Sequence, residues 1–426
     1  MNVRLVPVVI VVAALVAACG GGEGGSPNEA AAARGPIKVW YSNNQEEVAW
    51  AKTMITAWNT AHPNEKVTGQ EIPTGKSSEE VIGAAITAGN APCLVLNTSP
   101  AAVPGFQKQG GLVALDEMPG GREYVESRTG APAKQYRSPD GKYYQLPWKA
   151  NPVMIFYNKK LLKKAGVSAS KPPLGTYAEF LDTSRKIVKS GAAPAAIHPA
   201  PTSEFYQSWF DFYPLFIAAS GKQLVQDGKA QFNSPAGEQV ADFWKTLYTE
   251  GLAPNEKYNG DSFADGEAAM AIVGPWAVAV YDKVDWGVAP VPTSEGKPAS
   301  ETQTFSDEKS IAMYSACQNR GTAWDVLKFA TSKEQDGAFL EASGQMPMRT
   351  DLLTTYPEYF DKRAEYKQFA DQASRIVEVP NVANSVTIWQ TFRDAYSKSV
   401  IFGKEAPQGA LSGAAGKVDT LAQDGA

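Results

Sequence analysis

Residues 263–276, FADGEAAMAIVGPW, predict a buried strand that ends abruptly at a turn. The apolar run at 269–273 favours a strand, and Gly274-Pro275 stops it. Pro275 suits the first turn of a following helix. Trp276 would therefore lie just beyond the strand, where open α/β sheets bind their ligands.

The first hundred residues repeat this alternation of strand and helix. Strands are expected at 37–41, 66–72 and 92–96, and helices from about Glu46 and at 79–88. This rhythm is typical of an open α/β sheet. Amide and hydroxyl side chains follow two of these strands, where a ligand would lie. They are Ser42, Asn43, Asn44 and Asn97.

The remaining sequence predicts more elements of the same kind. Further strands are expected at 153–158 and 309–315. Residues 205–219 would form a helix that is apolar nearly all round, and Asp211 within it would need buried partners. The last major helix, within 380–402, carries Trp389. At 426 residues, the chain is too long for one ordinary core, so two α/β lobes are expected.

Composition excludes several classes of function. The formal net charge of −5 argues against a nucleic-acid partner. The only two histidines, His62 and His198, both precede proline, which weakens proposals of a zinc site or a Ser-His-Asp triad. No cofactor, metal or catalytic residue is expected. The 10 Trp residues favour a site that includes stacking rings, although most of them would pack in cores.

The N-terminus has the pattern of an export signal. Arg4 precedes an apolar run at 6–18 that is too short to span a membrane. Residues 15–20, LVAACG, match the lipobox of bacterial lipoproteins. The match implies a signal peptide at 1–18, a diacylglycerol and palmitate on Cys19, and an outward-facing protein in the cell envelope. The alternative is a plain secretory signal with an incidental cysteine.

Residues 19–35 are predicted to form a flexible, lipidated tether. They are rich in Gly, Ser and Ala and have no core pattern. A lipid anchor followed by a tether would leave the folded domain free at the membrane surface.

Motifs along the chain resemble the carbohydrate-binding proteins of ABC importers, the maltose-binding-protein-like family. Residues 263–276 are similar to the most characteristic stretch of this family. The other matches occur in order at 146–147, 156–166, 176–180, 287–292 and 345–349. The resemblance runs from about residue 37 to 421.

This resemblance implies a two-lobe periplasmic-binding-protein fold with the ligand cleft between the lobes. Three crossovers would form a hinge, near 148–152, 290–300 and 344–350, and closure would be a hinge motion. The N-terminal lobe would comprise residues 36–148 and 293–345. The C-terminal lobe would comprise residues 149–292 and 346–426.

The resemblance also implies a set of ligand contacts. Trp276 and Trp389 match stacking aromatics, and sugar C–H faces pack flat on indole. Asn97 stands where the maltose-binding protein has an aromatic, which together with the differing first-strand loop puts maltose itself in doubt. The full predicted set is Ser42, Asn43, Asn44, Asn97, Asn151, Trp209, Phe210, Asp211, Trp276, Asp307, Arg349 and Trp389. The forked groups among them suit vicinal hydroxyls.

Cys93 and Cys317 are predicted to form a disulfide. Export makes a disulfide chemically possible, and two free buried thiols are the alternative. The resemblance places the strands that carry them side by side and antiparallel in the first lobe, which brings facing residues within bridging distance.

The sequence therefore predicts the substrate-binding component of an ABC transporter. It would be a monomer that captures a carbohydrate, an oligosaccharide, outside the cytoplasmic membrane and delivers it to the permease subunits. A binding protein for a non-sugar organic solute is the first alternative. A secreted glycoside hydrolase is the second, although no carboxylate pair stands in a recognisable catalytic motif.

Overall fold

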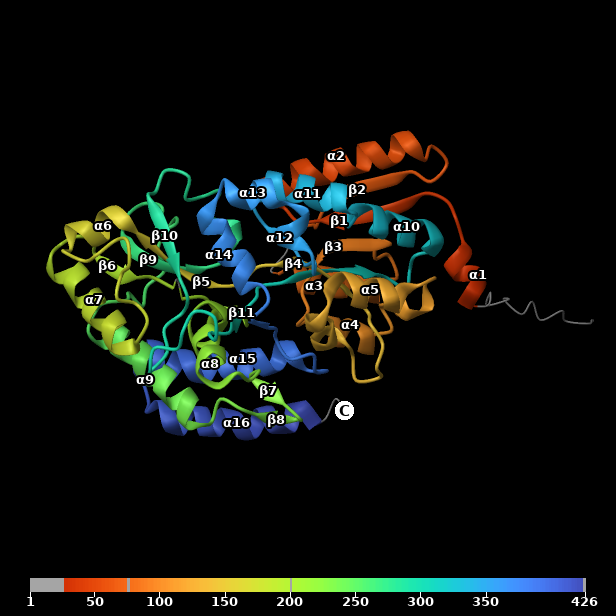
Figure 1. Cartoon of the computed structure of the whole chain (residues 1–426). Helices are drawn as coiled ribbons and strands as arrows, with labels where there is room; N and C mark the ends of the chain where they lie inside the picture. Colours follow the sequence, from red (N-terminus) through yellow and green to blue (C-terminus); the bar gives the residue numbers. More distant parts are fainter. Residues whose placement is uncertain (1–26, 75–76, 200, 424–426) are drawn as a thin grey trace, which may run out of the picture.

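The computed structural model describes residues 27–74, 77–199 and 201–423. The predicted signal peptide, the predicted lipidation site Cys19 and the first part of the predicted tether lie outside these residues. The described chain forms two α/β lobes that lie side by side (Figure 1).

The N-terminal lobe is built on a six-stranded sheet in the order β13-β4-β12-β3-β1-β2. Its first three strands are parallel and are joined by helices, as the sequence predicts. β12 then enters antiparallel between β3 and β4. The strands are β1 (Ile37–Tyr41), β2 (Val67–Glu71), β3 (Leu94–Thr98), β4 (Leu146–Ala150), β12 (Lys309–Met313) and β13 (Met346–Pro347). The helices of this lobe are α2 (Gln45–Ala61), α3 (Ser78–Thr87), α4 (Val103–Lys108), α5 (Gly121–Thr129), α10 (Arg320–Ala330) and α11 (Lys333–Ser343).

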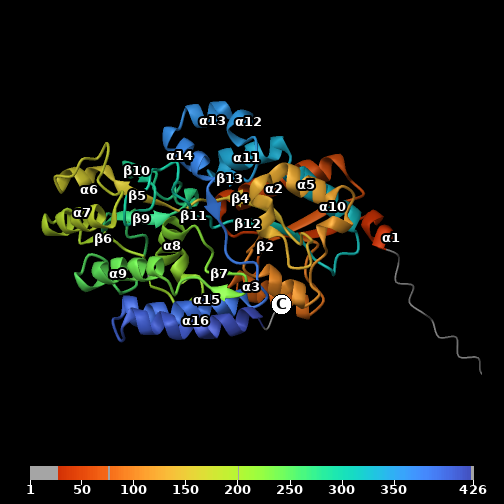
Figure 2. The same cartoon turned by 60° about the horizontal axis from the view of Figure 1, so that its bottom comes forward.

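The C-terminal lobe has a four-stranded sheet in the order β10-β5-β9-β6. Its helices lie on both sides of the sheet, and α15 and α16 run along one edge of the lobe (Figure 2). The strands are β5 (Met154–Asn158), β6 (Ala195–Ile197), β9 (Ala268–Val273) and β10 (Trp286–Ala289). The helices are α6 (Lys159–Lys164), α7 (Tyr177–Lys189), α8 (Phe212–Ser220), α9 (Pro235–Thr249), α12 (Leu352–Thr355), α13 (Pro357–Asp361), α14 (Ala364–Gln372), α15 (Ser385–Tyr396) and α16 (Pro407–Gln423). None of the described helices is long and apolar enough to cross a membrane.

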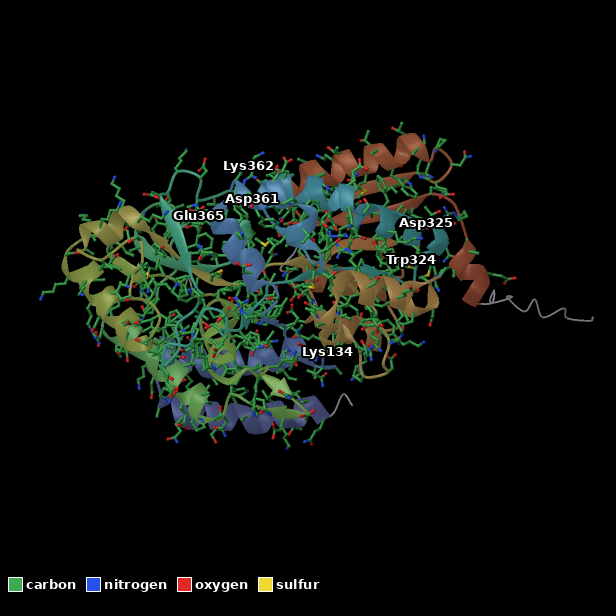
Figure 3. The ribbon with its side chains drawn as sticks, viewed as in Figure 1. Lys134, Trp324, Asp325, Asp361, Lys362 and Glu365 are labelled. Atoms are coloured by element: carbon green, nitrogen blue, oxygen red, sulfur yellow. A yellow bond between two sulfur atoms is a disulfide. The ribbon has the colours of Figure 1, made fainter. Side chains whose placement is uncertain are left out.

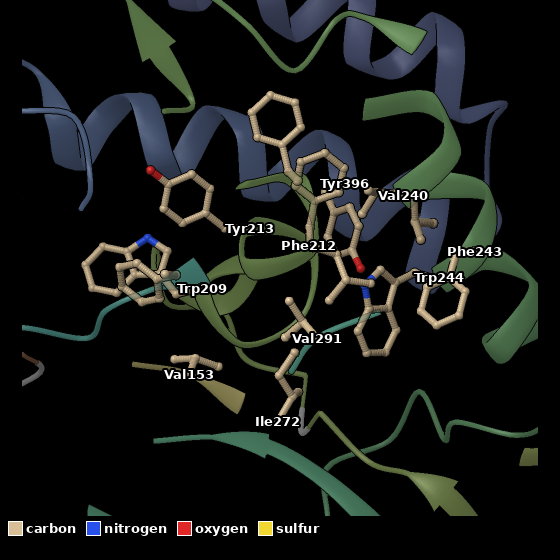
Figure 4. Packing of buried hydrophobic residues seen from close by; sticks show 14 of the residues in the cluster. Val153, Trp209, Phe212, Tyr213, Val240, Phe243, Trp244, Ile272, Val291 and Tyr396 are labelled. Atoms are coloured by element: carbon tan, nitrogen blue, oxygen red, sulfur yellow. The ribbon is translucent and has the colours of Figure 1, made fainter. Parts of the chain in front are cut away.

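Aromatic residues of α8 fill the C-terminal core (Figure 4). Phe212, Tyr213 and Phe216 are fully buried, which confirms the expectation of a helix that is apolar nearly all round. The helix begins later than predicted, because Asp211 caps its N-terminus and the preceding residues Gln207–Phe210 form a short 3₁₀ turn.

The predicted tether is shorter than expected at its C-terminal end. Residues Pro27–Ala32 form the helix α1, which packs against α10. The Arg34 guanidinium bonds the Glu65 carboxylate at 2.6 Å and also pairs with Asp325, which lies on α10 near α1 (Figure 3). The alanine run that looked unstructured has high helix propensity. Gly321 lets α10 approach it closely, because a Cβ there would meet the Ala31 carbonyl oxygen at 2.9 Å.

The chain passes between the two sheets at three places, and these crossovers are hydrogen-bonded to one another. The Val153 N–H donates to the Phe305 carbonyl at 2.8 Å, and the Thr304 hydroxyl donates to the Val153 carbonyl at 2.7 Å. The third crossover begins at β13, where Met346 pairs with Ala150 of β4 beside the first crossover. β11 (Thr304–Phe305), on the second crossover, also pairs with β14 (Ile376–Val377). The segments that would have to bend during lobe closure therefore lie together.

Cys93 and Cys317 form the predicted disulfide within the N-terminal lobe. Their Cα atoms are 4.5 Å apart. The Tyr314 N–H donates to the Cys93 carbonyl at 3.0 Å, so the antiparallel pairing of β3 and β12 continues up to the bridge.

Candidate ligand-binding cleft

A cavity of about 380 Å³ opens between the lobes beyond the carboxyl ends of β1, β2 and β3. The N-terminal lobe contributes a mainly polar wall: Ser42, Asn43, Ile72, Pro73, Thr74, Ser77, Ser78, Glu79 and Asn97. The C-terminal lobe contributes an aromatic wall: Phe205, Tyr206, Trp209 and Phe210. Asp307 and Lys309 line the floor near the crossovers. Six of the predicted contacts thus lie on one cavity: Ser42, Asn43, Asn97, Trp209, Phe210 and Asp307.

The loop after β1 is held in shape by its own hydrogen bonds. The Asn44 N–H donates to the Ser42 hydroxyl at 3.1 Å, and the Asn44 side chain accepts from the Glu47 N–H at 3.0 Å. Asn44 is therefore the N-cap of α2. The Asn44 side-chain oxygen is hydrogen-bonded to the helix backbone. Asn43 is exposed at the cavity, so its side-chain amide is the one that can bind a ligand.

Asn97 is fixed by a buried ion pair beneath the cavity. Lys149 Nζ lies 2.9 and 3.0 Å from the two Glu47 carboxylate oxygens, and 2.9 Å from Asn97 Oδ1. Burial, opposed by Glu47, lowers the pKa of Lys149. The pairing with Glu47 compensates part of the cost of burying both charges.

The aromatic wall comes from the 3₁₀ turn before α8. Trp209 packs against Phe305 with ring centroids 5.3 Å apart and edge-on against Trp389 at 5.6 Å. The Trp209 indole N–H is buried and has no hydrogen-bond partner within the described chain. A buried donor without an acceptor lowers the stability of the described conformation.

Trp276 does not line the cavity itself but packs against Phe210, which does. It is half-buried, and it contacts Phe210 edge-to-face with centroids 5.8 Å apart. Its ring covers Gly274 so closely that a Cβ there would lie 2.0 Å from the ring. Trp276 therefore supports the Phe210 wall, and the glycine before Pro275 is required by this packing.

Three of the other predicted contacts are buried away from the cavity wall. Trp389 is fully buried behind Trp209, and Asn151 is buried, where its amide donates to the Asp307 carbonyl and to Gln345 at 3.1 Å each. Asp211 is fully buried inside the C-terminal lobe, where burial raises the pKa of its carboxyl to about 7. It accepts from Gln207 at 3.1 Å and caps α8, so its role here is structural.

Arg349 lies at a different hollow between the lobes. It is ion-paired with Asp336 at 2.9 Å and Asp351 at 3.0 Å. This hollow, about 840 Å³, is lined by crossover and α14 residues such as Met348 and Gln372. It is larger than the first cavity, but none of the parallel strands β1–β3 ends at it, so the first cavity fits the rule for ligand sites in open α/β sheets.

The charges that face the cavity are mostly paired. The Asp307 carboxylate binds the Lys309 ammonium. Burial lowers the pKa of Lys309, but Asp307 together with the charges of Glu79 and Glu378 raises it more, so its net shift is upward and the ammonium stays protonated. No hydrogen bond or ion pair of Glu79 occurs within the described chain, so its carboxylate is available to a ligand.

Sequence reasoning missed the residues after β2. Thr74, Ser77, Ser78 and Glu79 line the cavity, and they follow the end of β2 just as Ser42 follows β1. The rule that identified the loops after the first and third strands would have identified this one too. Tyr206 was missed because the aromatic stretch around it was expected to continue as a buried helix.

Comparisons with known proteins agree with this arrangement. The sequence pattern of a family described as bacterial extracellular solute-binding protein matches residues 41–337. A putative binding protein of Brucella abortus is 25% identical over 297 residues, covering 66% of this chain and 68% of the relative. The maltodextrin-binding protein of Bacillus subtilis is 24% identical over 318 residues, covering 71% of each.

A solved structure shows the same fold over nearly the whole chain. The GacH receptor of Streptomyces glaucescens, solved unliganded and in complex with acarbose, superposes with a TM-score of 0.77 at 23% identity. The match covers 92% of this chain and all of the receptor. The predicted two-lobe fold is confirmed.

Proposed function

Because the chain belongs to the bacterial extracellular solute-binding protein family, we propose that it captures a carbohydrate between its lobes and delivers it to the permease of an ABC importer. The family implies an outward-facing location. The relative from Bacillus subtilis binds maltodextrin, which supports an oligosaccharide as the ligand.

The observation that carries this proposal is the pairing of an aromatic wall with a polar wall across one cavity. Trp209, Phe210 and Tyr206 present rings on one side, and Asn43, Asn97 and their neighbours present hydrogen-bonding groups on the other. A sugar ring has this same division, with apolar C–H faces and a rim of hydroxyls.

The two lobes are proposed to close on the ligand as rigid bodies, residues 36–148 with 293–345 and residues 149–292 with 346–426. In the described conformation they already touch, because Ala101 of the N-terminal lobe packs in the hydrophobic cluster of the other lobe. The hydrogen-bonded crossovers would absorb the change of angle. A site shared by both lobes couples this closure to occupancy.

The residues of the same cavity argue against a glycosidase. Of its two carboxylates, Asp307 is ion-paired with Lys309. A glycosidase needs two carboxyl groups that are both free to act on the substrate. We therefore propose a binding protein without catalytic activity, which acts as a monomer.

The N-terminus is proposed to carry the membrane anchor. The lipobox at 15–20 supports cleavage before Cys19 and its acylation. Mass spectrometry of protein from its native membrane would then find a mature chain that begins at acylated Cys19. An unmodified chain with another N-terminus would contradict the anchor.

A thermal-shift screen tests the proposed ligand class. Mono-, di- and oligosaccharides would be compared with amino acids, a polyamine and glycerol phosphate. A ligand at 100 times its dissociation constant adds about 2.7 kcal/mol of stability. Stabilisation by a carbohydrate is expected, and stabilisation by a non-sugar solute alone would overturn the proposal.

A further inference from the structure

Residues 159–190 concentrate positive charge on an otherwise acidic protein. They hold eight lysine and arginine residues and only two acidic residues, whereas the formal net charge of the whole chain is −5. The segment contains α6 and α7, which contact each other at one end of the C-terminal lobe (Figure 1). The Lys164 ammonium donates to the Gly191 carbonyl, just beyond α7, at 2.8 Å, so the C-terminal ends of the two helices lie together.

Six exposed lysines of this segment make no ion pair within the described chain. The two acidic residues of the segment are engaged elsewhere. Glu179 accepts from the Thr176 N–H at 3.0 Å, and Asp182 pairs with Arg185 at 2.9 Å. The six residues, which we call the lysine face, are Lys160, Lys163, Lys164, Lys171, Lys186 and Lys189.

Helix ends explain part of this pattern. The last turn of a helix favours cations, and four of the six lysines stand in the last turns of α6 and α7. Lys160 and Lys171 stand outside these turns, so the helix ends do not account for them. Like charges held close together repel one another, and an anionic partner would relieve this repulsion.

The chemistry of the lysine face favours a membrane surface over a protein partner. Protein interfaces bury a core of apolar and aromatic side chains, in which arginine is enriched and lysine is depleted. The large apolar side chains that are exposed in the described chain are Val280, Val386 and Phe402, and none of them lies on α6 or α7. Lysine ammonium groups are point charges on flexible stems, which suits a fluid layer of anionic lipid headgroups.

We propose that the lysine face binds the anionic headgroups of the membrane that the N-terminal anchor is proposed to enter. α6 and α7 lie at the end of the molecule opposite α1, the first described element after the anchor, in both Figure 1 and Figure 2. Contact at both ends lays the protein lengthwise along the membrane. Because the attraction is electrostatic, it is reversible and weakens with salt.

The test is co-sedimentation with lipid vesicles of the chain after Cys19, which carries no acyl group and includes every described residue. Vesicles of phosphatidylglycerol and phosphatidylcholine in equal parts are compared with vesicles of phosphatidylcholine alone. Binding is expected to the anionic vesicles only, and it should disappear between about 0.05 M and about 0.5 M salt, because the Debye length shortens. The vesicles contain no permease, so absence of binding to the anionic ones would overturn the membrane as the partner.

The variant that tests the face is Lys160→Gln/Lys163→Gln/Lys186→Gln/Lys189→Gln. It removes four exposed charges and keeps the contact of Lys164 with the Gly191 carbonyl. Its partitioning onto anionic vesicles should fall at least about tenfold, because each lysine near the surface adds to the attraction.

The matched control removes four exposed, unpaired lysines of the N-terminal lobe: Lys52→Gln/Lys66→Gln/Lys108→Gln/Lys134→Gln. Its net charge equals that of the test variant, but its partitioning should change by less than about twofold, because charges far from the membrane are screened. Both variants should unfold at the same urea concentration as the natural chain. An equal loss of binding in both would show that net charge alone decides, and would overturn the lysine face.

Discussion

Lys149 orients Asn97 from beneath the cavity, because its ammonium donates to Asn97 Oδ1 across 2.9 Å. The side-chain oxygen is thereby engaged within the N-terminal lobe. The amide nitrogen of Asn97, which has no partner in the described chain, is left to donate to the ligand. The buried charge pair thus determines the hydrogen-bonding character of a cavity residue.

Replacement of this donor should weaken binding without unfolding the protein. Asn97→Asp keeps the contact with Lys149 but offers the ligand only acceptor oxygens. The ligand affinity is expected to fall by about 1–3 kcal/mol, the cost of an unsatisfied buried group. Calorimetry with the best sugar measures the affinity, and an unchanged dissociation constant would show that Asn97 does not contact it.

Removal of Lys149 should destabilise the N-terminal lobe. Lys149→Met leaves Glu47 buried without a counter-charge, so the free energy of unfolding should fall by about 3–5 kcal/mol. Urea unfolding measures this. The double variant Glu47→Leu/Lys149→Met should recover most of the loss, because an apolar pair often replaces a buried ion pair without cost. A single variant as stable as the natural protein would contradict the buried-pair argument.

The disulfide should matter for stability and not for binding. Cys93→Ser/Cys317→Ser is expected to lower the free energy of unfolding by about 2–5 kcal/mol. Both cysteines lie in one lobe, so closure does not strain the bridge, and sugar affinity should stay within twofold. A large loss of affinity in the folded variant would indicate that the bridge also positions the cleft. Thiol titration of the denatured, unreduced natural protein should find neither cysteine free.

The alternation of strands and helices was predictable because each apolar strand is bounded by clear turn residues. The polar loops after β1 and β3 were predictable for the same reason. α1 was missed because its alanine run has no core pattern, and because α10, which it packs against, is distant in sequence.

The roles of Asp211, Trp389 and Arg349 could not be derived from sequence. Each is a polar or aromatic residue of a type that suits sugar binding, but burial inside a lobe or pairing with Asp336 decides its role. A family match gives only the approximate position of each ligand contact in the chain. A shift of one or two residues near Trp209 is enough to turn a side chain from the cavity into the core.

Trp276 remains a predicted ligand contact, and the structure gives the prediction a sharper form. Trp276→Ala should weaken sugar binding by about 1–3 kcal/mol, because the ring backs Phe210 at the cavity edge. The melting temperature of the ligand-free protein should change little, since the ring is only half-buried. Phe402→Ala, an exposed aromatic away from the cavity, is the control. A large loss of ligand-free stability with intact affinity would make Trp276 a core residue.

Two carboxyls near the hinge, Glu308 and Glu378, should make stability depend on pH. Burial raises the pKa of Glu308 from 4.5 to about 8. Burial and the neighbouring Glu308 also raise the pKa of Glu378 well above its ordinary value. The folded protein therefore holds protons that the unfolded chain releases near pH 4.5.

The sign of the effect follows from these raised pKa values. Stability from Glu308 is fully present below about pH 4.5 and is lost as the pH rises through about 8. Glu308→Gln stays neutral at every pH and can still accept the Trp148 N–H, so it should flatten the fall in unfolding free energy between about pH 5 and 8. A residual slope should remain, because burial also raises the pKa of Glu378 and of Asp211. Urea unfolding at three pH values in this range measures the slope.

Glu123→Gln, at an exposed position of α5, is the control and should show the same slope as the natural protein. Equal slopes in the natural protein and in Glu308→Gln would show that Glu308 is ionised in the fold.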